Sequence, residues 1–284
     1  MNNDGKKESQ DSYYVCPVSK QPLTPTTNGL FCQQEGVEYP VKNGIPDFVV
    51  EDFTESPNLF LRSVDKMDES AGMYEDPWYG IIDKVNAELG LPSLEDMAKM
   101  MIEMVDAENG VGLDVACGTG FVTRPLAQKM RFVCGIDISM GMLEMATEYA
   151  REREIGNIRF ARGMAEKLPF PDGVFDGVIC SGALHLFQDT VEVLNEMARV
   201  MKRGARLAVN TIVKGDLSTL KMYLERAGAS IPFGTSTPFG KKESLEMLHL
   251  FDVEELDSYL SQTGFNGFTY DIYGPAILFH AEKG

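Results

Sequence analysis

The stretch Val111-Gly112-Leu113-Asp114-Val115-Ala116-Cys117-Gly118-Thr119-Gly120 decides the fold of this chain. An apolar strand, residues 111–115, runs into a glycine turn, and a helix-like segment, residues 121–130, follows. A second apolar strand, residues 132–136, ends in Asp137, seventeen residues after Gly120. Glycines at such a turn let the backbone approach a ligand closely, and the acid can bind ribose hydroxyls. The pattern therefore predicts a cofactor that contains a nucleoside.

The turn differs from the fingerprint of dinucleotide-binding proteins, which needs three glycines in the order G-x-G-x-x-G. The third position is Thr123 here. Asp114, at the end of the first strand, is an additional acid that could hold a cationic amino group or organise the loop. A cofactor with a ribose and a zwitterionic amino-acid tail therefore fits better than one with a pyrophosphate.

With these features, residues 70–284 resemble the class I S-adenosylmethionine-dependent methyltransferases, whose first motif is an acid followed by x-x-C/G-G-x-G. Later segments resemble the further motifs in their usual order, namely residues 132–139, 162–170, 175–185 and 196–204. The closest subgroup is that of the quinone-biosynthesis-like and small-molecule methyltransferases. The resemblance implies an α/β fold: a Rossmann-like, seven-stranded, mostly parallel sheet with helices on both faces.

The resemblance also implies S-adenosyl-L-methionine as cofactor, S-adenosyl-L-homocysteine as product, and no metal. The residues expected to bind the cofactor are Asp114, Ala116, Gly118, Gly120, Asp137, Ile138, Met164, Ala165, Ser181 and Gly182. Asp137 is expected at the ribose, Asp114 at the methionine end, and Ala165 at the adenine. Met164 departs from the family, which usually has an acid here for the adenine amino group. The backbone amide of Ala165 and the face of the Met164 side chain are expected to serve the adenine instead.

Candidate residues for the acceptor side are fewer. His185 is the best candidate for a general base, which oxygen and carbon acceptors need and thiols or thioethers do not. A structural histidine that caps the following helix is an equally open alternative. Aromatic residues are expected to cover the substrate, with plain surface aromatics as the alternative, and they are Tyr74, Trp78, Phe233 and Phe239.

The N-terminal segment, residues 13–50, has the pattern of a small β appendage after a disordered start. The order Cys16-Pro17-Val18-Ser19, then Cys32, resembles the zinc-ribbon-like module that precedes some methyltransferase domains. A structural zinc site needs four Cys or His ligands, and Ser19 occupies the place of the second one. We therefore expect no zinc. The expected division is 1–50 for the appendage, 51–105 for a linker and helices, and 106–284 for the cofactor-binding domain with a lid insertion at 215–250.

Composition limits the partners. The chain has 284 residues, with 43 acids against 26 bases and a net charge of −17, which argues against nucleic acid and against docking to anionic lipid. It contains no apolar run of about 20 residues, so no integral membrane segment is expected. Five cysteines without a signal peptide favour a reducing, cytoplasmic location, with a removed organelle leader as the open alternative. The oligomeric state stays open.

The leading hypothesis is methyl transfer to a soluble small-molecule acceptor, with the acceptor atom (O, S, N or C) undetermined. A prenylated quinone-type C-methyltransferase is the alternative within the class. From other classes, an NAD-type oxidoreductase and a non-catalytic subunit that binds S-adenosylmethionine are the competing interpretations. The missing third glycine argues against the oxidoreductase, and the intact acids and glycines argue against the silent subunit.

Overall fold

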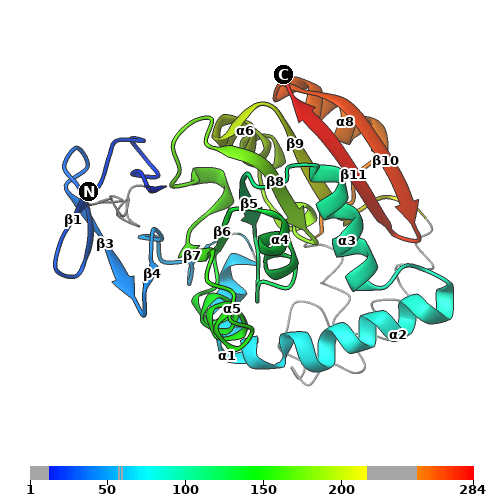
Figure 1. The fold of residues 1–284 in the computed structure, drawn as a ribbon, viewed down its shortest axis with the longest axis horizontal. Coiled ribbons are helices and arrows are strands. Elements are labelled where there is room, and N and C mark those ends of the chain that lie inside the picture. Colours follow the sequence, from blue (N-terminus) through cyan, green and yellow to red (C-terminus); the bar gives the residue numbers. More distant parts are fainter. Residues whose placement is uncertain (1–12, 57, 59, 216–247) are drawn as a thin grey trace, which may run out of the picture.

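A seven-stranded sheet in the order β10-β11-β9-β8-β5-β6-β7 forms the centre of the molecule (Figure 1). This computed structural model describes residues 13–56, 58, 60–215 and 248–284. The strands are β5 (Val111–Val115), β6 (Phe132–Asp137), β7 (Ile158–Arg162), β8 (Phe175–Ser181), β9 (Met201–Ile212), β10 (Phe265–Tyr273) and β11 (Ala276–Lys283). Strand β11 runs antiparallel to both of its neighbours, and the remaining pairs are parallel. The expected Rossmann-like, mostly parallel sheet is confirmed.

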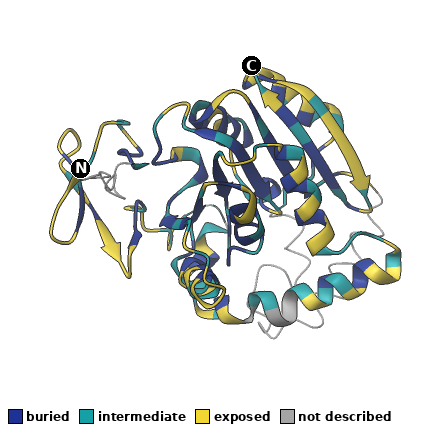
Figure 2. Cartoon of the chain, in the orientation of Figure 1, coloured by how far each residue is buried: buried dark blue, intermediate teal, exposed yellow. Residues whose placement is uncertain are grey.

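Helices cover both faces of the sheet, as expected. They are α3 (Leu94–Val105), α4 (Thr123–Lys129), α5 (Met140–Glu152), α6 (Thr190–Val200) and α8 (Val253–Gln262). Side chains of β8 alternate between the two faces because successive strand residues point in opposite directions. Val178 and Cys180 join the core cluster that contains residues of α6 and α8, whereas Ile179 joins the cluster that contains residues of α3, α4 and α5. Buried positions accordingly concentrate in the strands (Figure 2).

Helix α3 shows how the sequence sets one of these contacts. Ser93 is its N-cap, and the Ser93 hydroxyl accepts a hydrogen bond from the amide of Asp96 at 3.1 Å. Two methionines of this helix, Met97 and Met101, are buried. Gly177 in β8 lets the helix approach the sheet closely, because a Cβ atom added at Gly177 would lie 2.1 Å from Cγ1 of Val105.

Strand β9 begins at Met201, directly after α6, within the segment 196–204 that resembles a family motif. A shift of register between Phe175 and Gly177 interrupts the β8–β9 pairing, and Gly204 adopts a φ of +76° within β9. The chain after α6 therefore contains an irregularity inside the strand.

A run of short helices leads from the N-terminal part into the sheet. It comprises η2 (Leu61–Ser63), α1 (Val64–Ser70), η3 (Ala71–Met73), the π-helix η4 (Tyr74–Tyr79) and α2 (Gly80–Leu89). Within residues 51–105, where a linker and helices are expected, the first helical element that the structure describes thus begins at Leu61. Figure 1 shows α1 beside α5 and α2 extending below the sheet.

The N-terminal appendage, which we define as residues 13–50, is a four-stranded antiparallel sheet beside the β7 edge of the main sheet (Figure 1). Its strands are β1 (Thr24–Pro25), β2 (Gly29–Cys32), β3 (Val37–Lys42) and β4 (Ile45–Pro46). Near the start of the appendage, Val15 forms an isolated antiparallel bridge with Pro22. The thiols of Cys16 and Cys32 are buried, and Ser19 Oγ lies 3.5 Å from Cys32 Sγ.

Candidate functional site

A cavity of about 510 Å³ opens at the carboxyl ends of the parallel strands. This is where open α/β sheets bind ligands, and the volume is that of a small-molecule site. The expected site residues that line it are Asp114, Ala116, Gly118, Asp137, Ile138, Met164, Ala165, Ser181, Gly182, His185 and Tyr74. Segments that lie far apart in the sequence thus meet at one cavity because their strands end at one edge of the sheet.

The glycine turn after β5 presents its backbone to the cavity. Ala116, Gly118 and Gly120 have φ angles of +56°, +52° and +77°. A Cβ atom added at Gly118 would meet nothing within 4 Å, whereas one added at Gly120 would lie 3.3 Å from the Cβ of Ala146. Gly118 therefore faces open space, and Gly120, which is not a lining residue, allows close packing behind the turn. A positive φ at an alanine costs roughly 1–3 kcal/mol, and such strain clusters at ligand sites.

Asp114 at the end of β5 is the most unusual group of the site. Its carboxylate is buried, and Oδ2 accepts a hydrogen bond from the Thr123 hydroxyl at 2.6 Å. Within the described residues, Oδ1 has no hydrogen-bond partner. Burial raises the pKa of Asp114 to about 7, and the negative charge of Asp137 adds to the rise. Buried polar atoms are nearly always paired, so the unpaired Oδ1 is a candidate acceptor for a hydrogen bond from a bound ligand.

Asp137 at the end of β6 lies on the other side of the glycine turn. Its Oδ2 accepts a hydrogen bond from the Gly118 amide at 2.8 Å, and its Oδ1 accepts one from the Ser139 amide at 2.9 Å. Burial raises the pKa of this carboxyl group, and the backbone hydrogen bonds oppose the rise. Each oxygen keeps a second lone pair, so the carboxylate can still accept hydrogen bonds from a ligand.

The segment after β7 forms a further wall. The amide of Gly163 donates to the carbonyl of Asp137 at 2.9 Å, and Met164 and Ala165 follow along the cavity. Glu166 also lines it and did not figure among the expected residues. Burial raises the pKa of Glu166. Its position beside Ala165 was the available sequence signal.

Ser181, the last residue of β8, lines the cavity together with Gly182 and His185, which follow the strand. Gly182 has a φ of +68°, and a Cβ atom added there would meet nothing within 4 Å, so its backbone is open to the cavity. His185 is buried, and its Nδ1 lies 3.1 Å from the Thr211 hydroxyl. Burial lowers the pKa of His185 to about 4, so the imidazole is neutral at pH 7.

Helix η4 connects the short helices before the sheet to the glycine turn through side-chain contacts. Glu75 forms an ion pair with Arg124 at 2.8 Å and accepts a hydrogen bond from the Thr119 hydroxyl at 2.6 Å. The ring of Tyr79 meets that of Phe121 edge-on, with centroids 4.9 Å apart. These contacts hold η4 against the residues that follow the turn.

A second tie links α1 to the start of α5, next to Asp137. The carboxylate of Asp68 accepts hydrogen bonds from the Ser139 hydroxyl at 2.5 Å and from the Gly141 amide at 3.1 Å. A Cβ atom added at Gly141 would lie 2.5 Å from the carbonyl oxygen of Asp68, so the two backbones touch. Helix α1 therefore closes the side of the cavity next to Asp137.

Of the expected covering aromatics, Tyr74 lines the cavity. Trp78 belongs to the same π-helix, but its side chain is outside the described part of the structure. Phe233 and Phe239 lie outside the described residues.

The cavity continues past the cofactor motifs into an apolar compartment that sequence analysis did not predict. Its walls include Ile82, Leu91, Pro92, Leu94, Met97, Ile212 and Pro275. Asn86, Asn210 and Tyr273 add polar groups. Asn210 Nδ2 lies 3.7 Å from Met97 Sδ, and the Tyr273 hydroxyl lies 3.7 Å from Met100 Sδ, which are weak acceptors. No Lys or Arg is among the described residues that line the cavity. In the sequence, the feature that could have indicated this compartment is a polar residue near the end of a core strand, as Asn210 is in β9.

The middle part of the chain is similar to known proteins. A family model described as a methyltransferase domain matches residues 113–209. Residues 113–209 form a methyltransferase domain. Over 114 residues, the chain is 37% identical to an uncharacterized methyltransferase of Bacillus subtilis (YcgJ), a match that covers 39% of this chain and 44% of that protein. It is 32% identical over 130 residues to a demethylmenaquinone methyltransferase of Listeria welshimeri, covering 44% and 55% respectively.

The chain spans about half the length of these curated relatives. Among solved structures, an S-adenosylmethionine-dependent methyltransferase from Aquifex aeolicus superposes on 75% of this chain and 97% of its own length, with a TM-score of 0.54 and 20% identity. That likeness shows that the methyltransferase domain has the class I fold. Among the described residues, no helix is long and apolar enough to cross a membrane. The same residues contain no group of three or more His, Cys, Asp or Glu side chains that could hold a metal ion.

Proposed function

We propose that this chain is a cytoplasmic methyltransferase that uses S-adenosyl-L-methionine to methylate a soluble small molecule. The observation that carries the proposal is Asp114, a lining residue of the cavity whose buried Oδ1 has no hydrogen-bond partner among the described residues. When bound, the cofactor supplies a methyl group already activated by a positively charged sulfur. Asp114 would hold its ammonium group, Asp137 the ribose, and Met164 with Ala165 the adenine.

The charge of the cavity argues against a dinucleotide. Asp114, Asp137 and Glu166 line it, and no described lining residue is a cation. A pyrophosphate would bring negative charge next to these carboxylates without a basic partner, which is unfavourable in a buried site. The missing third glycine supports the same preference over an NAD-type oxidoreductase.

The apolar compartment points to the kind of acceptor. Because the methyl group is already activated, the chain mainly has to hold the acceptor in line with it and exclude water. Apolar walls with a few neutral polar groups, Asn86, Asn210 and Tyr273, suit a small soluble molecule whose bound part is uncharged and partly apolar. These walls accommodate a ring or a short chain. They do not determine which atom of the acceptor receives the methyl group.

His185 would shape the acceptor side of the site rather than supply a strong base. A group whose pKa is lowered to about 4 takes up a proton poorly at pH 7. Acceptors that need no strong base, such as thiols and thioethers, are therefore favoured over carbon acids. The runner-up, C-methylation of a prenylated quinone, is supported by the similarity to the Listeria welshimeri protein named demethylmenaquinone methyltransferase.

Replacement of Asp137 by alanine tests the cofactor assignment. Asp137→Ala should weaken the affinity for S-adenosyl-L-homocysteine by about 1.5–3 kcal/mol, the contribution of a charge-assisted hydrogen-bond pair. Isothermal titration calorimetry measures it, and Asp271→Ala, which removes an exposed acid of β10, is the control. An unchanged affinity in Asp137→Ala would contradict the assignment.

Transfer of labelled methyl from S-adenosyl-L-methionine into a fractionated cell extract tests the acceptor class. We expect label among small soluble metabolites. Label in the lipid fraction would favour the quinone-type alternative. Cofactor binding without transfer to any fraction would favour the non-catalytic subunit.

A further inference from the structure

We propose that the N-terminal appendage positions the segment that binds the adenine ring, so that cofactor affinity depends on Asp47 and Lys20. This inference rests on the proposed function. The segment concerned is residues 162–170, whose members Gly163, Met164, Ala165 and Glu166 line the cavity. Backbone and side-chain groups of the appendage bind this segment at both of its ends.

The first end is held at the edge of the sheet. Asp47 bridges to Arg162 in parallel, and the amide of Phe48 donates to the carbonyl of Arg162 at 2.8 Å. The Asp47 carboxylate is buried and forms an ion pair with the Arg162 guanidinium at 3.3 Å. The same guanidinium donates through Nε to the carbonyl of Ile138 at 2.8 Å. Arg162 therefore connects the appendage to the residue that follows Asp137.

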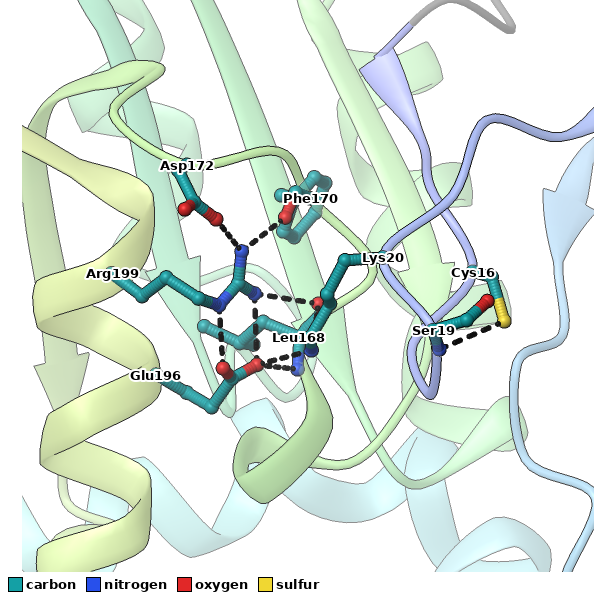
Figure 3. Close-up of polar contacts among 8 residues, drawn as sticks. All are labelled: Cys16, Ser19, Lys20, Leu168, Phe170, Asp172, Glu196 and Arg199. Atoms are coloured by element: carbon teal, nitrogen blue, oxygen red, sulfur yellow. Dashed lines mark hydrogen bonds and ion pairs between the residues drawn. The ribbon is translucent and has the colours of Figure 1, made fainter.

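The second end is held between the appendage and α6 (Figure 3). The ammonium group of Lys20 donates to the carbonyl of Leu168 at 3.3 Å and forms an ion pair with Glu196 at 2.7 Å. Glu196 in turn accepts a hydrogen bond from the Leu168 amide at 2.7 Å. The amide of Val15 donates to the carbonyl of Pro169 at 2.9 Å. Arg199 completes the cluster by donating to the carbonyls of Leu168 and Phe170.

The turn that would have carried two ligands of a zinc ribbon sets the place of Lys20. The amide of Ser19 donates to Cys16 Sγ at 3.5 Å, and the amide of Lys20 donates to the carbonyl of Cys16 at 2.9 Å (Figure 3). Lys20 adopts a φ of +57°, a conformation that costs a non-glycine residue free energy. This geometry directs the ammonium group at Leu168 and Glu196.

The backbone is short between Arg162 and Leu168, two residues that the appendage contacts. Met164 and Ala165 lie two and three residues beyond Arg162, and Leu168 follows three residues after Ala165. Loss of either anchor lets the intervening backbone sample other conformations, and part of the binding free energy must then restore the one that fits the ligand. The appendage thus acts on the adenine side of the cofactor and leaves the methionine side unaffected.

The test compares two ligands on the full-length chain. S-adenosyl-L-homocysteine contains both the adenosine and the amino acid, whereas 5′-methylthioadenosine lacks the amino acid. Asp47→Asn and Lys20→Met, each without its ion pair, should bind both ligands roughly three- to tenfold more weakly, by the same factor for each. Asp47→Glu should recover part of the affinity. Calorimetry gives the dissociation constants, and thermal unfolding confirms that each variant is folded at the temperature used.

The matched control variants each lose an ion pair that lies outside residues 162–170. Asp106→Asn breaks the pair with Arg206, and Lys202→Met breaks the pair with Asp176. Both should bind the ligands like the parent chain. Folded Asp47→Asn and Lys20→Met variants with unchanged affinity would overturn the inference, as would a loss confined to S-adenosyl-L-homocysteine. If Asp47→Asn does not fold, Lys20→Met alone decides. A parent chain that binds neither ligand would instead overturn the proposed function.

Discussion

Two buried carboxylates with different surroundings define the site at the scale of single residues. Asp137 accepts hydrogen bonds from two backbone amides. Asp114 accepts one from a hydroxyl group, and its other oxygen is buried without a hydrogen-bond partner among the described residues. Desolvation disfavours the charged form of each, and it raises the pKa of Asp114 to about 7. In the ligand-free chain the stabilising contribution of a protonated Asp114 is therefore full below the unfolded pKa near 4 and is lost as pH rises through about 7. A bound ammonium group would compensate the ionised form.

The affinity for S-adenosyl-L-homocysteine should consequently rise with pH. Below about pH 6 the gain should approach tenfold per pH unit, because binding to the ionised carboxylate releases one proton. It should fall to about fivefold between about pH 6 and pH 7 and level off near pH 8. Calorimetry at a series of pH values measures this. 5′-Methylthioadenosine, which has no ammonium group, should show a flat profile. The same flat profile is expected of S-adenosyl-L-homocysteine with Asp114→Asn, and a pH dependence that persists in that variant would contradict the role of Asp114.

Close contacts between elements decide how the site is held together. Helix η4 is fixed by the pair of Glu75 with Arg124, and α1 by the hydrogen bonds to Asp68. Helix α3, whose residue Met97 lines the apolar compartment, approaches β8 at Gly177. Backbone approach of this kind depends on the missing side chain, because a Cβ atom at Gly177 would overlap Val105.

Gly177→Ala should therefore destabilise the chain by about 1–3 kcal/mol, the usual cost of overpacking a core. Urea unfolding gives the free energy. Combining it with Val105→Ala should restore part of the stability, because the smaller residue leaves room for the new methyl group. Gly156→Ala, where an added Cβ meets nothing within 4 Å, is the control and should stay within about 0.5 kcal/mol. Strictly additive effects of Gly177→Ala and Val105→Ala would contradict the contact.

On the scale of the whole molecule, the appendage and the methyltransferase domain share one core. Tyr14, Tyr39 and Phe48 of the appendage belong to the same cluster of buried residues as Phe170 and Phe175. The ring centroids of Tyr14 and Phe170 are 5.6 Å apart. Although Figure 1 shows the appendage as a projection beside β7, its apolar side is therefore covered by the domain.

The two parts should consequently unfold together. Cys16 and Cys32 of the appendage and Cys180 of β8 are all free, buried thiols, so they should react with a thiol reagent at the same slow rate in native conditions. Mass spectrometry of chains labelled for increasing times, at several urea concentrations, measures each rate. Labelling of Cys16 and Cys32 well before Cys180 would indicate that the appendage opens on its own.

The sequence by itself determined the sheet and the motif residues of the cavity. Apolar strands, the glycine turn and the acids at strand ends are local patterns, and parallel strands bring their carboxyl ends to one edge. It did not reveal the apolar compartment, because Asn86, Asn210 and Tyr273 come from segments that meet only after folding. It did not reveal the role of Lys20 and Asp47 either, since their partners Leu168 and Arg162 lie more than a hundred residues away. Only the tertiary structure brings such groups together, because their contacts depend on packing between elements and not on the local chain.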